Sequence, residues 1–83
     1  MKYTVGVKPR AKKDLRRIQK QDATRIANTL AQLEDDLSGD VKHLTNHSPE
    51  YRLRVGSYRV LFEIENDNRI VVYRIVHRRD AYR

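Results

Sequence analysis

The stretch from Tyr51 to Phe62 constrains the fold of this 83-residue chain more than any other. Two runs that alternate apolar and basic residues flank Gly56 and Ser57, and a glycine in first place suits the mirror-image turns that match the twist of paired strands. We therefore expect a β-hairpin with a two-residue turn. The predicted pairs across it are Val55 with Tyr58, Arg54 with Arg59, Leu53 with Val60 and Arg52 with Leu61.

This register gives the hairpin one apolar face and one basic face. Arg54 lies directly across from Arg59, and Arg52 follows two residues away on the same face. Like charges that oppose each other across a ladder destabilise it. The pattern is therefore typical either of a solvated basic strand face or of a surface that binds a polyanion.

The net charge narrows the class of partner. Eighteen Lys and Arg against eleven Asp and Glu give a formal charge of +7, which on a small surface favours binding to nucleic acid or to an acidic protein. Basic residues on strands as well as helices argue against a membrane surface, and no apolar run is long enough for a signal peptide or a membrane span. We expect a single cytoplasmic domain, residues 1–83, without disulfides because the chain has no cysteine.

The first half of the chain predicts a strand followed by two helices. Lys2 to Val7 alternates as a strand does, and Ala11 to Ile18 has helical spacing, with Pro9 in a position where a helix can begin. Four cations point away from the apolar side of that helix: Lys12, Lys13, Arg16 and Arg17.

The second predicted helix begins with Asp22 as its N-cap and ends at Ser38-Gly39-Asp40. Its apolar stripe comprises Ala23, Ile26, Ala27, Leu30, Leu33 and Leu37. We expect this stripe to pack on a sheet as part of the core.

The segment from Val41 to Pro49 has no sustained period and reads as a loop. His43 and His47 stand four apart in it, but no carboxylate or thiolate completes a ligand set, so we predict no metal site. Two further strands are predicted after the hairpin turn, Tyr58 to Glu65 and Ile70 to His77.

A two-residue turn at Asp67-Asn68 would join these two strands. It would direct Val71, Tyr73 and Ile75 to the core face. The opposite face would then hold Arg52, Arg54, Arg59, Arg74 and, if the last strand continues, Arg78, around an apolar floor of Leu61, Val72 and Val76.

These elements predict an α+β fold with the order β-α-α-β-β-β. An N-terminal strand precedes a helical hairpin, which packs on one face of an antiparallel sheet. The other face of that sheet is basic, and a charged groove with an apolar floor suits a nucleic acid or a wrapping peptide.

Two stretches carry a resemblance to a known family. Tyr51 to Ile64 reads Tyr-Arg-Leu-Arg-Val-Gly-Ser-Tyr-Arg-Val-Leu-Phe-Glu-Ile, and the chain ends Tyr-Arg-Ile-Val-His-Arg-Arg-Asp-Ala-Tyr-Arg. Together with the Lys8-Pro9-Arg10-Ala11 opening of the helix pair, they resemble the RelE branch of the RelE/ParE toxin superfamily over essentially the whole chain.

The resemblance implies a toxin of a type II toxin-antitoxin pair with a RelE-like fold. RelE-like proteins cut messenger RNA in the ribosomal A site, so the expected activity is that of an endoribonuclease without metal or cofactor, in which the 2′-hydroxyl attacks the adjacent phosphate. The expected partners are the ribosome with its rRNA, the mRNA, and a cognate antitoxin in a hetero-oligomer.

By motif position, Arg54, Arg59, Arg78 and Tyr82 are the expected catalytic residues. Fixed guanidinium groups stabilise the charge that accumulates on the phosphorane oxygens. Tyr82 would take the 2′-hydroxyl proton, because a crowd of cations lowers a phenol pKa from about 10. The expected RNA-binding residues are Arg52, Arg74, His77, Lys12, Lys13, Arg16 and Arg17.

The leaving 5′-oxygen needs a proton or a countercharge. Arg78 supplies charge but is a reluctant acid. His77 titrates nearer neutrality, but strand alternation turns it away from Arg78, so it ranks lower. Some relatives have lysines where this chain has Arg52 and Arg54, which puts a proton-transfer role for these two in doubt.

Two other functions are compatible with the same fold. A ParE-like inhibitor of DNA gyrase would bind a protein and need no proton-transfer residues. A non-enzymatic RNA-binding module would lose affinity by degrees as single arginines are removed.

Overall fold

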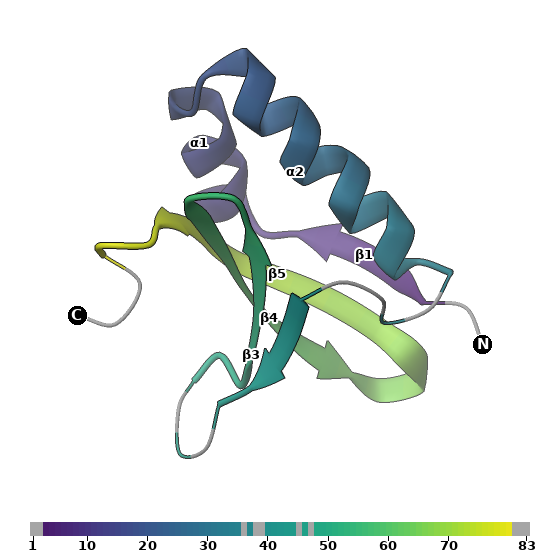
Figure 1. The fold of residues 1–83 in the computed structure, drawn as a ribbon. Coiled ribbons are helices and arrows are strands. Elements are labelled where there is room, and N and C mark those ends of the chain that lie inside the picture. The colour runs from purple at the N-terminus through teal and green to yellow at the C-terminus, as the bar shows by residue number, and fades with distance from the viewer. Residues whose placement is uncertain (1–2, 36, 38–39, 45, 47, 81–83) are drawn as a thin grey trace.

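Over residues 3–35, 37, 40–44, 46 and 48–80, which the computed structural model describes, the chain forms one five-stranded sheet and two helices (Figure 1). The elements are β1 (Thr4–Val7), α1 (Pro9–Arg17), α2 (Lys20–Leu33), β2 (Asp40–His43), β3 (Tyr51–Val55), β4 (Tyr58–Glu65), the 3-10 turn η1 (Asn66–Asn68) and β5 (Arg69–His77). The sheet order is β1-β5-β4-β3-β2. The predicted α+β class is confirmed.

The pairing of β1 differs from the prediction. The two central junctions and the β2 junction are antiparallel, but β1 pairs with β5 in parallel, so the sheet is mixed. Parallel neighbours need a long crossover connection, and here the helical hairpin and three strands lie between them in sequence. Periodicity alone does not reveal such a pairing, because its partners are far apart in the chain.

Both helices lie on one face of the sheet (Figure 1). Pro9 occupies the first turn of α1, where a missing N–H costs nothing, and Arg16 and Arg17 complement the helix dipole in its last turn. The second helix begins earlier than predicted: Gln19 is its N-cap, and Asp22 lies within the first turn. The predicted cap at Asp22 is therefore wrong, although its carboxylate still suits the positive end of the helix.

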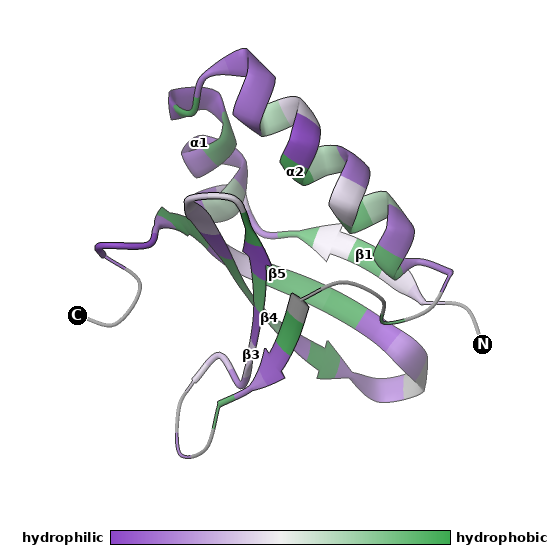
Figure 2. Cartoon of the chain, in the orientation of Figure 1, coloured by the Kyte–Doolittle hydropathy of each residue, from purple (hydrophilic) through white to green (hydrophobic). Residues whose placement is uncertain are grey.

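Fewer residues of α2 are buried in the core than the predicted apolar stripe contains. Ile26, Leu30 and Leu33 are buried, whereas Ala27 is exposed. The helix ends at Leu33, so Leu37 packs against the core from beyond it; Ser38 and Gly39 lie outside the described residues. Hydrophilic residues cover most of α1, and β5 is hydrophobic along its middle (Figure 2). The buried core comprises Ala11, Ile26, Leu30, Leu33, Leu53, Val55, Val60, Phe62, Ile70, Val72 and Ile75.

The strand β2 occupies part of the segment that reads as a loop. Asp40–His43 pairs antiparallel with β3, from Asp40 opposite Arg54 to His43 opposite Tyr51. Because this strand has four residues and only Val41 is apolar, it is too short to show a period. The prediction of a continuous loop over Val41 to Pro49 is wrong for its first three residues.

The register of the β3–β4 hairpin is confirmed pair by pair. Tyr58 opposes Val55, and Arg59 opposes Arg54. Val60 and Phe62 are fully buried on the face covered by the helices. The turn chemistry and the alternation were sufficient here because both are local.

The β4–β5 register differs from the prediction in its first half. The connection is the three-residue η1, so Glu65 opposes Arg69, and Asn68 has a φ of 67°. One extra residue reverses the faces of a strand. Ile70 and Val72 therefore enter the core, and the predictions that Val71 and Tyr73 face the core and that Val72 lies on the open face are wrong.

A β-bulge restores the predicted register further along. Phe62 opposes Val72 but Leu61 opposes Arg74, so Tyr73 is the extra residue. From there Ile75 lies in the core, as predicted, and Arg74 lies across from Leu61 on the open face. The bulge thus cancels the shift that the turn introduces.

Candidate nucleic-acid interface

Two arginines face each other at the turn end of the β3–β4 hairpin. Arg54 is exposed, while Arg59, directly across the ladder, is only 7% exposed. Both belong to the open face of the sheet, opposite the helices. We call Arg54, Gly56, Ser57 and Arg59 the hairpin tip.

Arg59 is held by the turn itself. Its Nη1 donates to the carbonyl oxygens of Gly56 at 3.1 Å and of Tyr58 at 2.9 Å. Gly56 has a φ of 57°, which glycine adopts without strain and which turns its carbonyl toward this guanidinium. Arg59 is therefore a fixed donor at the hairpin tip and also stabilises the turn, a structural role that the sequence did not predict.

Arg78 joins the same tip through its backbone. The strand β5 ends at His77, so Arg78 begins a turn rather than extending the strand. Its N–H donates to the Ser57 carbonyl at 2.7 Å, and the N–H of Asp80 closes the turn on the His77 carbonyl at 2.8 Å. The backbone of the exposed Arg78 thus lies at the hairpin turn, next to Ser57, whereas Tyr82 lies outside the described residues.

Arg52 and Arg74 lie one row further along the open face. Arg52 opposes Leu61 on β4, and Leu61 opposes Arg74 on β5, so the two arginines flank a buried leucine. On the other side, Lys42 of β2 pairs with Arg52. The open face is basic across four strands.

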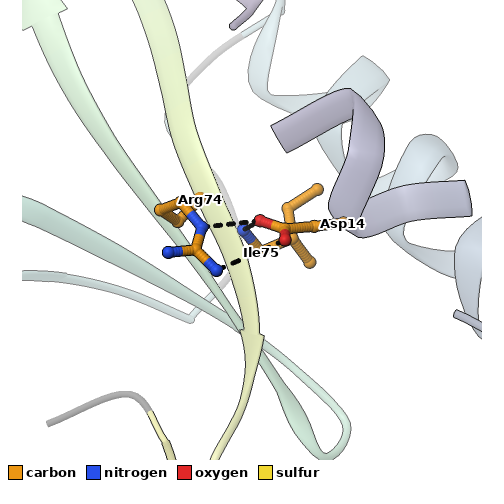
Figure 3. Close-up of polar contacts among 3 residues, drawn as sticks. All are labelled: Asp14, Arg74 and Ile75. Carbon is orange, nitrogen blue, oxygen red and sulfur yellow. Dashed lines mark hydrogen bonds and ion pairs between the residues drawn. The ribbon is translucent and has the colours of Figure 1, made fainter. Parts of the chain in front are cut away.

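The guanidinium of Arg74 forms an ion pair with Asp14 of helix α1 (Figure 3). Asp14 Oδ2 accepts hydrogen bonds from Arg74 Nε and from the Ile75 N–H, both at 2.9 Å, and Asp14 Oδ1 accepts one from Arg74 Nη2 at 3.3 Å. The hydrogen bond to Asp14 raises the pKa of Arg74 above its ordinary value, in spite of the opposing effect of burial. Arg74 therefore stays a cation in a fixed orientation.

A groove of about 610 Å³ lies beside Arg74. Tyr73 and Glu63 line it together with Lys8, Pro9, Arg10, Ser48 and Pro49. Burial, and next the charges of Glu65 and Glu63, raise the pKa of Tyr73, whose hydroxyl is 3.3 Å from Glu65 Oε2. A phenol in this environment keeps its proton, so Tyr73 is unsuited to act as a base.

The remaining predicted RNA-binding residues lie elsewhere. The His77 ring meets the Tyr58 ring edge-on at 5.5 Å between centroids, and its Nδ1 accepts from the Arg79 N–H at 3.3 Å. It belongs to the face that carries Tyr58, away from Arg59. The four residues of α1 that were predicted to bind RNA are exposed on the helix layer rather than on the open face: Lys12, Lys13, Arg16 and Arg17.

One cation near the tip was not predicted. Arg25 of α2 places its guanidinium against Gly56, close enough that a Cβ at that position would lie 3.1 Å from Arg25 Nη1. No motif or period in the sequence singles out Arg25. No metal site was predicted at His43 and His47. In the structure, His43 Nε2 lies 3.6 Å from Glu50 Oε2, and His47 lies outside the described residues.

Among the described residues, no helix is long and apolar enough to cross a membrane.

Comparisons with known proteins agree on one family. Residues 5–82 match the family model described as ParE toxin of type II toxin-antitoxin system, parDE. Toxin RelE3 of Methanocaldococcus jannaschii is 38% identical over 48 residues, which cover 58% of this chain and 53%, about half, of that protein.

Solved structures with the same fold include two antitoxin complexes. The match to the RelE-RelB complex of Pyrococcus horikoshii has a TM-score of 0.80 and 26% identity, over 98% of this chain and 100% of that one. The match to the RelB-RelE complex of Methanococcus jannaschii has a TM-score of 0.76 and 26% identity, over 92% and 93%. The chain therefore belongs to the ParE toxin family of type II toxin-antitoxin systems, and within it is a RelE-like toxin.

Proposed function

We propose that this toxin is a ribosome-dependent endoribonuclease that cuts mRNA in the ribosomal A site and so inhibits translation. The observation that carries the proposal is the pairing of Arg54 with Arg59 on the open face, next to the turn at which the Arg78 backbone is bound. These are three of the residues for which the family resemblance implies catalysis.

The reaction asks for positive charge at a single phosphate. The 2′-oxygen attacks phosphorus, the bond to the 5′-oxygen breaks, and negative charge accumulates on the phosphorane oxygens between these events. Arg59, held by two carbonyls, is a preorganised donor, and the exposed Arg54 lies beside it. Each well-placed donor of this kind contributes about 3 kcal/mol to lowering the barrier.

Proton transfer rests on the motif rather than on the described geometry. Tyr82 is proposed to take the 2′-hydroxyl proton, since cations close to a phenol favour its phenolate. Arg78 is proposed to balance the charge on the leaving 5′-oxygen, which takes its proton from water. Metal and cofactor have no part in this scheme.

RNA outside the cleaved bond is proposed to lie along the other cations. Arg52 and Arg74 extend the open face, and the exposed cations of α1 together with His77 offer further contacts to mRNA or rRNA. Phosphate contacts of this kind give affinity that falls with salt and carries little sequence preference. We assign the choice of cut position to the ribosome, which orients the RNA.

Regulation is proposed to come from a cognate antitoxin in a hetero-oligomer. The two solved relatives described above are complexes with an antitoxin. An acidic or amphipathic segment that covers the open face would neutralise its arginines and exclude RNA. The proposed targets, ribosome and mRNA, place the activity in the cytoplasm.

Primer extension on translating ribosomes tests the proposal. We expect codon-positioned cuts with the unchanged toxin, and losses of about 100-fold in cleavage rate for Arg54→Gln, Arg78→Gln and Tyr82→Phe. Arg69→Gln, an exposed arginine at the other end of β5, is the matched control and should cut normally. Absence of cuts with the unchanged toxin would refute the nuclease proposal.

A second candidate follows from the description of the matching family model, which is that of a ParE toxin. Under this alternative the chain inhibits DNA gyrase by binding it. A supercoiling assay with purified gyrase distinguishes the two: inhibition that survives Tyr82→Phe, without cuts on ribosomes, would favour the ParE-like function.

A further inference from the structure

The hairpin tip is approached from the helix side by Arg25. A Cβ built on Gly56 would lie 3.1 Å from Arg25 Nη1 and 3.7 Å from its Cζ. The guanidinium therefore rests against the backbone of the turn, in space that any other residue would fill. Only a glycine both adopts the φ of 57° and leaves this room.

Arg59 reaches the same glycine from the open face. Its Nη1 lies 3.1 Å from the Gly56 carbonyl oxygen, so guanidinium groups from α2 and from β4 meet at one residue. Arg54 opposes Arg59, and the Arg78 N–H is bound to Ser57. Arginines from four separate segments of the chain thus converge on a two-residue turn.

The convergence concentrates positive charge at the turn. A guanidinium offers forked N–H donors that match the oxygens of a phosphate. The Arg25 side chain is exposed, and the Arg25 backbone carbonyl accepts a hydrogen bond from Thr29 Oγ1. An anion bound at the tip would find such donors on two sides, from Arg25 and from Arg59.

We infer that Arg25 completes a phosphodiester-binding site at the hairpin tip, in which it and Arg59 hold neighbouring non-bridging oxygens of the RNA backbone. The inference rests on the proposed function, because it names a further residue of the same site. It adds an element that the family motif lacks: α2 contributes to the interface and does not merely cover the sheet.

The experiment compares three variants of the full chain. Arg25→Gln removes the charge with little change in helix propensity, Arg25→Lys keeps the charge but loses the forked donors, and Lys20→Gln removes an exposed cation at the start of the same helix. Single-turnover cleavage on programmed ribosomes is measured at saturating toxin, alongside the midpoint of urea unfolding.

We expect Arg25→Gln to cut about tenfold more slowly, with an unchanged unfolding midpoint, and Arg25→Lys to recover part of the rate. Lys20→Gln should stay within about twofold of the unchanged toxin. A normal rate for Arg25→Gln, or a lower rate that follows a lower unfolding midpoint equally in both Arg25 variants, would overturn the inference.

A second measurement separates this inference from the proposed function. If the unchanged toxin does not cut, the proposed function fails, and binding of a 2′-O-methyl RNA is then followed against salt concentration. Loss of one phosphate contact lowers the slope of log affinity against log salt by about 0.7 for single strands. An unchanged slope in Arg25→Gln would overturn the phosphodiester site independently of catalysis.

Discussion

Asp14 and Arg74 are 60 residues apart in the sequence, yet Asp14 Oδ2 lies 2.9 Å from Arg74 Nε. The same oxygen accepts the Ile75 N–H, which lies on the edge of β5 beyond the last residue paired with β1. One carboxylate thus docks α1, satisfies a strand-edge amide and orients a cation of the open face. An uncovered strand edge invites pairing with other chains, and α1 covers this one.

Asp14→Ala should lower the free energy of unfolding by about 2 kcal/mol, because it leaves a backbone N–H and a partly buried guanidinium without their acceptor. Urea unfolding followed by circular dichroism measures the loss. Asp35→Ala is the control, since Asp35 is an exposed aspartate beyond the end of α2 and should change the value by less than about 0.5 kcal/mol. Equal losses in the two variants would contradict the docking role of Asp14.

Arg59 and Arg54 should differ in what they contribute to stability. Arg59→Gln removes two hydrogen bonds to the turn from a buried side chain, which predicts a loss of about 1–3 kcal/mol. Arg54→Gln changes an exposed side chain and should lower stability by less than Arg59→Gln does. Urea titrations compare them, and a larger loss in Arg54→Gln would show that the turn does not depend on Arg59.

Gly56→Ala should destabilise the fold for two reasons, backbone strain and a steric contact. A left-handed φ costs a non-glycine residue about 1–2 kcal/mol, and the added methyl group would meet Arg25. Gly6→Ala is the matched control, because a Cβ there would have its nearest neighbours at 3.8 and 4.0 Å. Thermal unfolding of Gly56→Ala with and without Arg25→Ala separates the two causes. The part of the stability loss that Arg25→Ala restores is due to the steric contact, and the part that remains is due to the backbone conformation.

Tyr73 should make stability depend on pH in the alkaline range. Burial and the nearby Glu65 and Glu63 hold the folded-state pKa of Tyr73 above its ordinary value. Between about pH 10 and that raised value the folded chain binds more protons than the unfolded one, so stability is fully present below this window and falls as pH rises through it. Urea unfolding of the unchanged chain and of Tyr73→Phe should diverge there, and parallel curves would contradict the raised pKa.

The sequence predicted the parts of the fold that depend on neighbours in the chain. The Gly56-Ser57 turn and the alternation around it were enough for the β3–β4 register and for the pairing of Arg54 with Arg59. The β4–β5 register depends on two compensating irregularities, a three-residue turn and the bulge at Tyr73. A pattern of alternation cannot reveal two shifts that cancel.

The same distinction applies to the candidate site. Arginines on adjacent strands could be placed together from register alone, whereas Arg25 and Asp14 reach the sheet only through the packing of the helices. Neither residue breaks the helical pattern around it. Their roles became visible once the distances to Gly56 and to Arg74 were known.

The parallel pairing of β1 with β5 has a consequence for synthesis. Thr4 has Arg69 as its ladder partner, so the first strand to leave the ribosome must wait for the last one. Contacts between such distant residues slow folding, because the loop between them must close first. A growing chain therefore cannot complete its sheet until β5 has been translated, and a product truncated before β5 would lack the strand that joins β1 to β4.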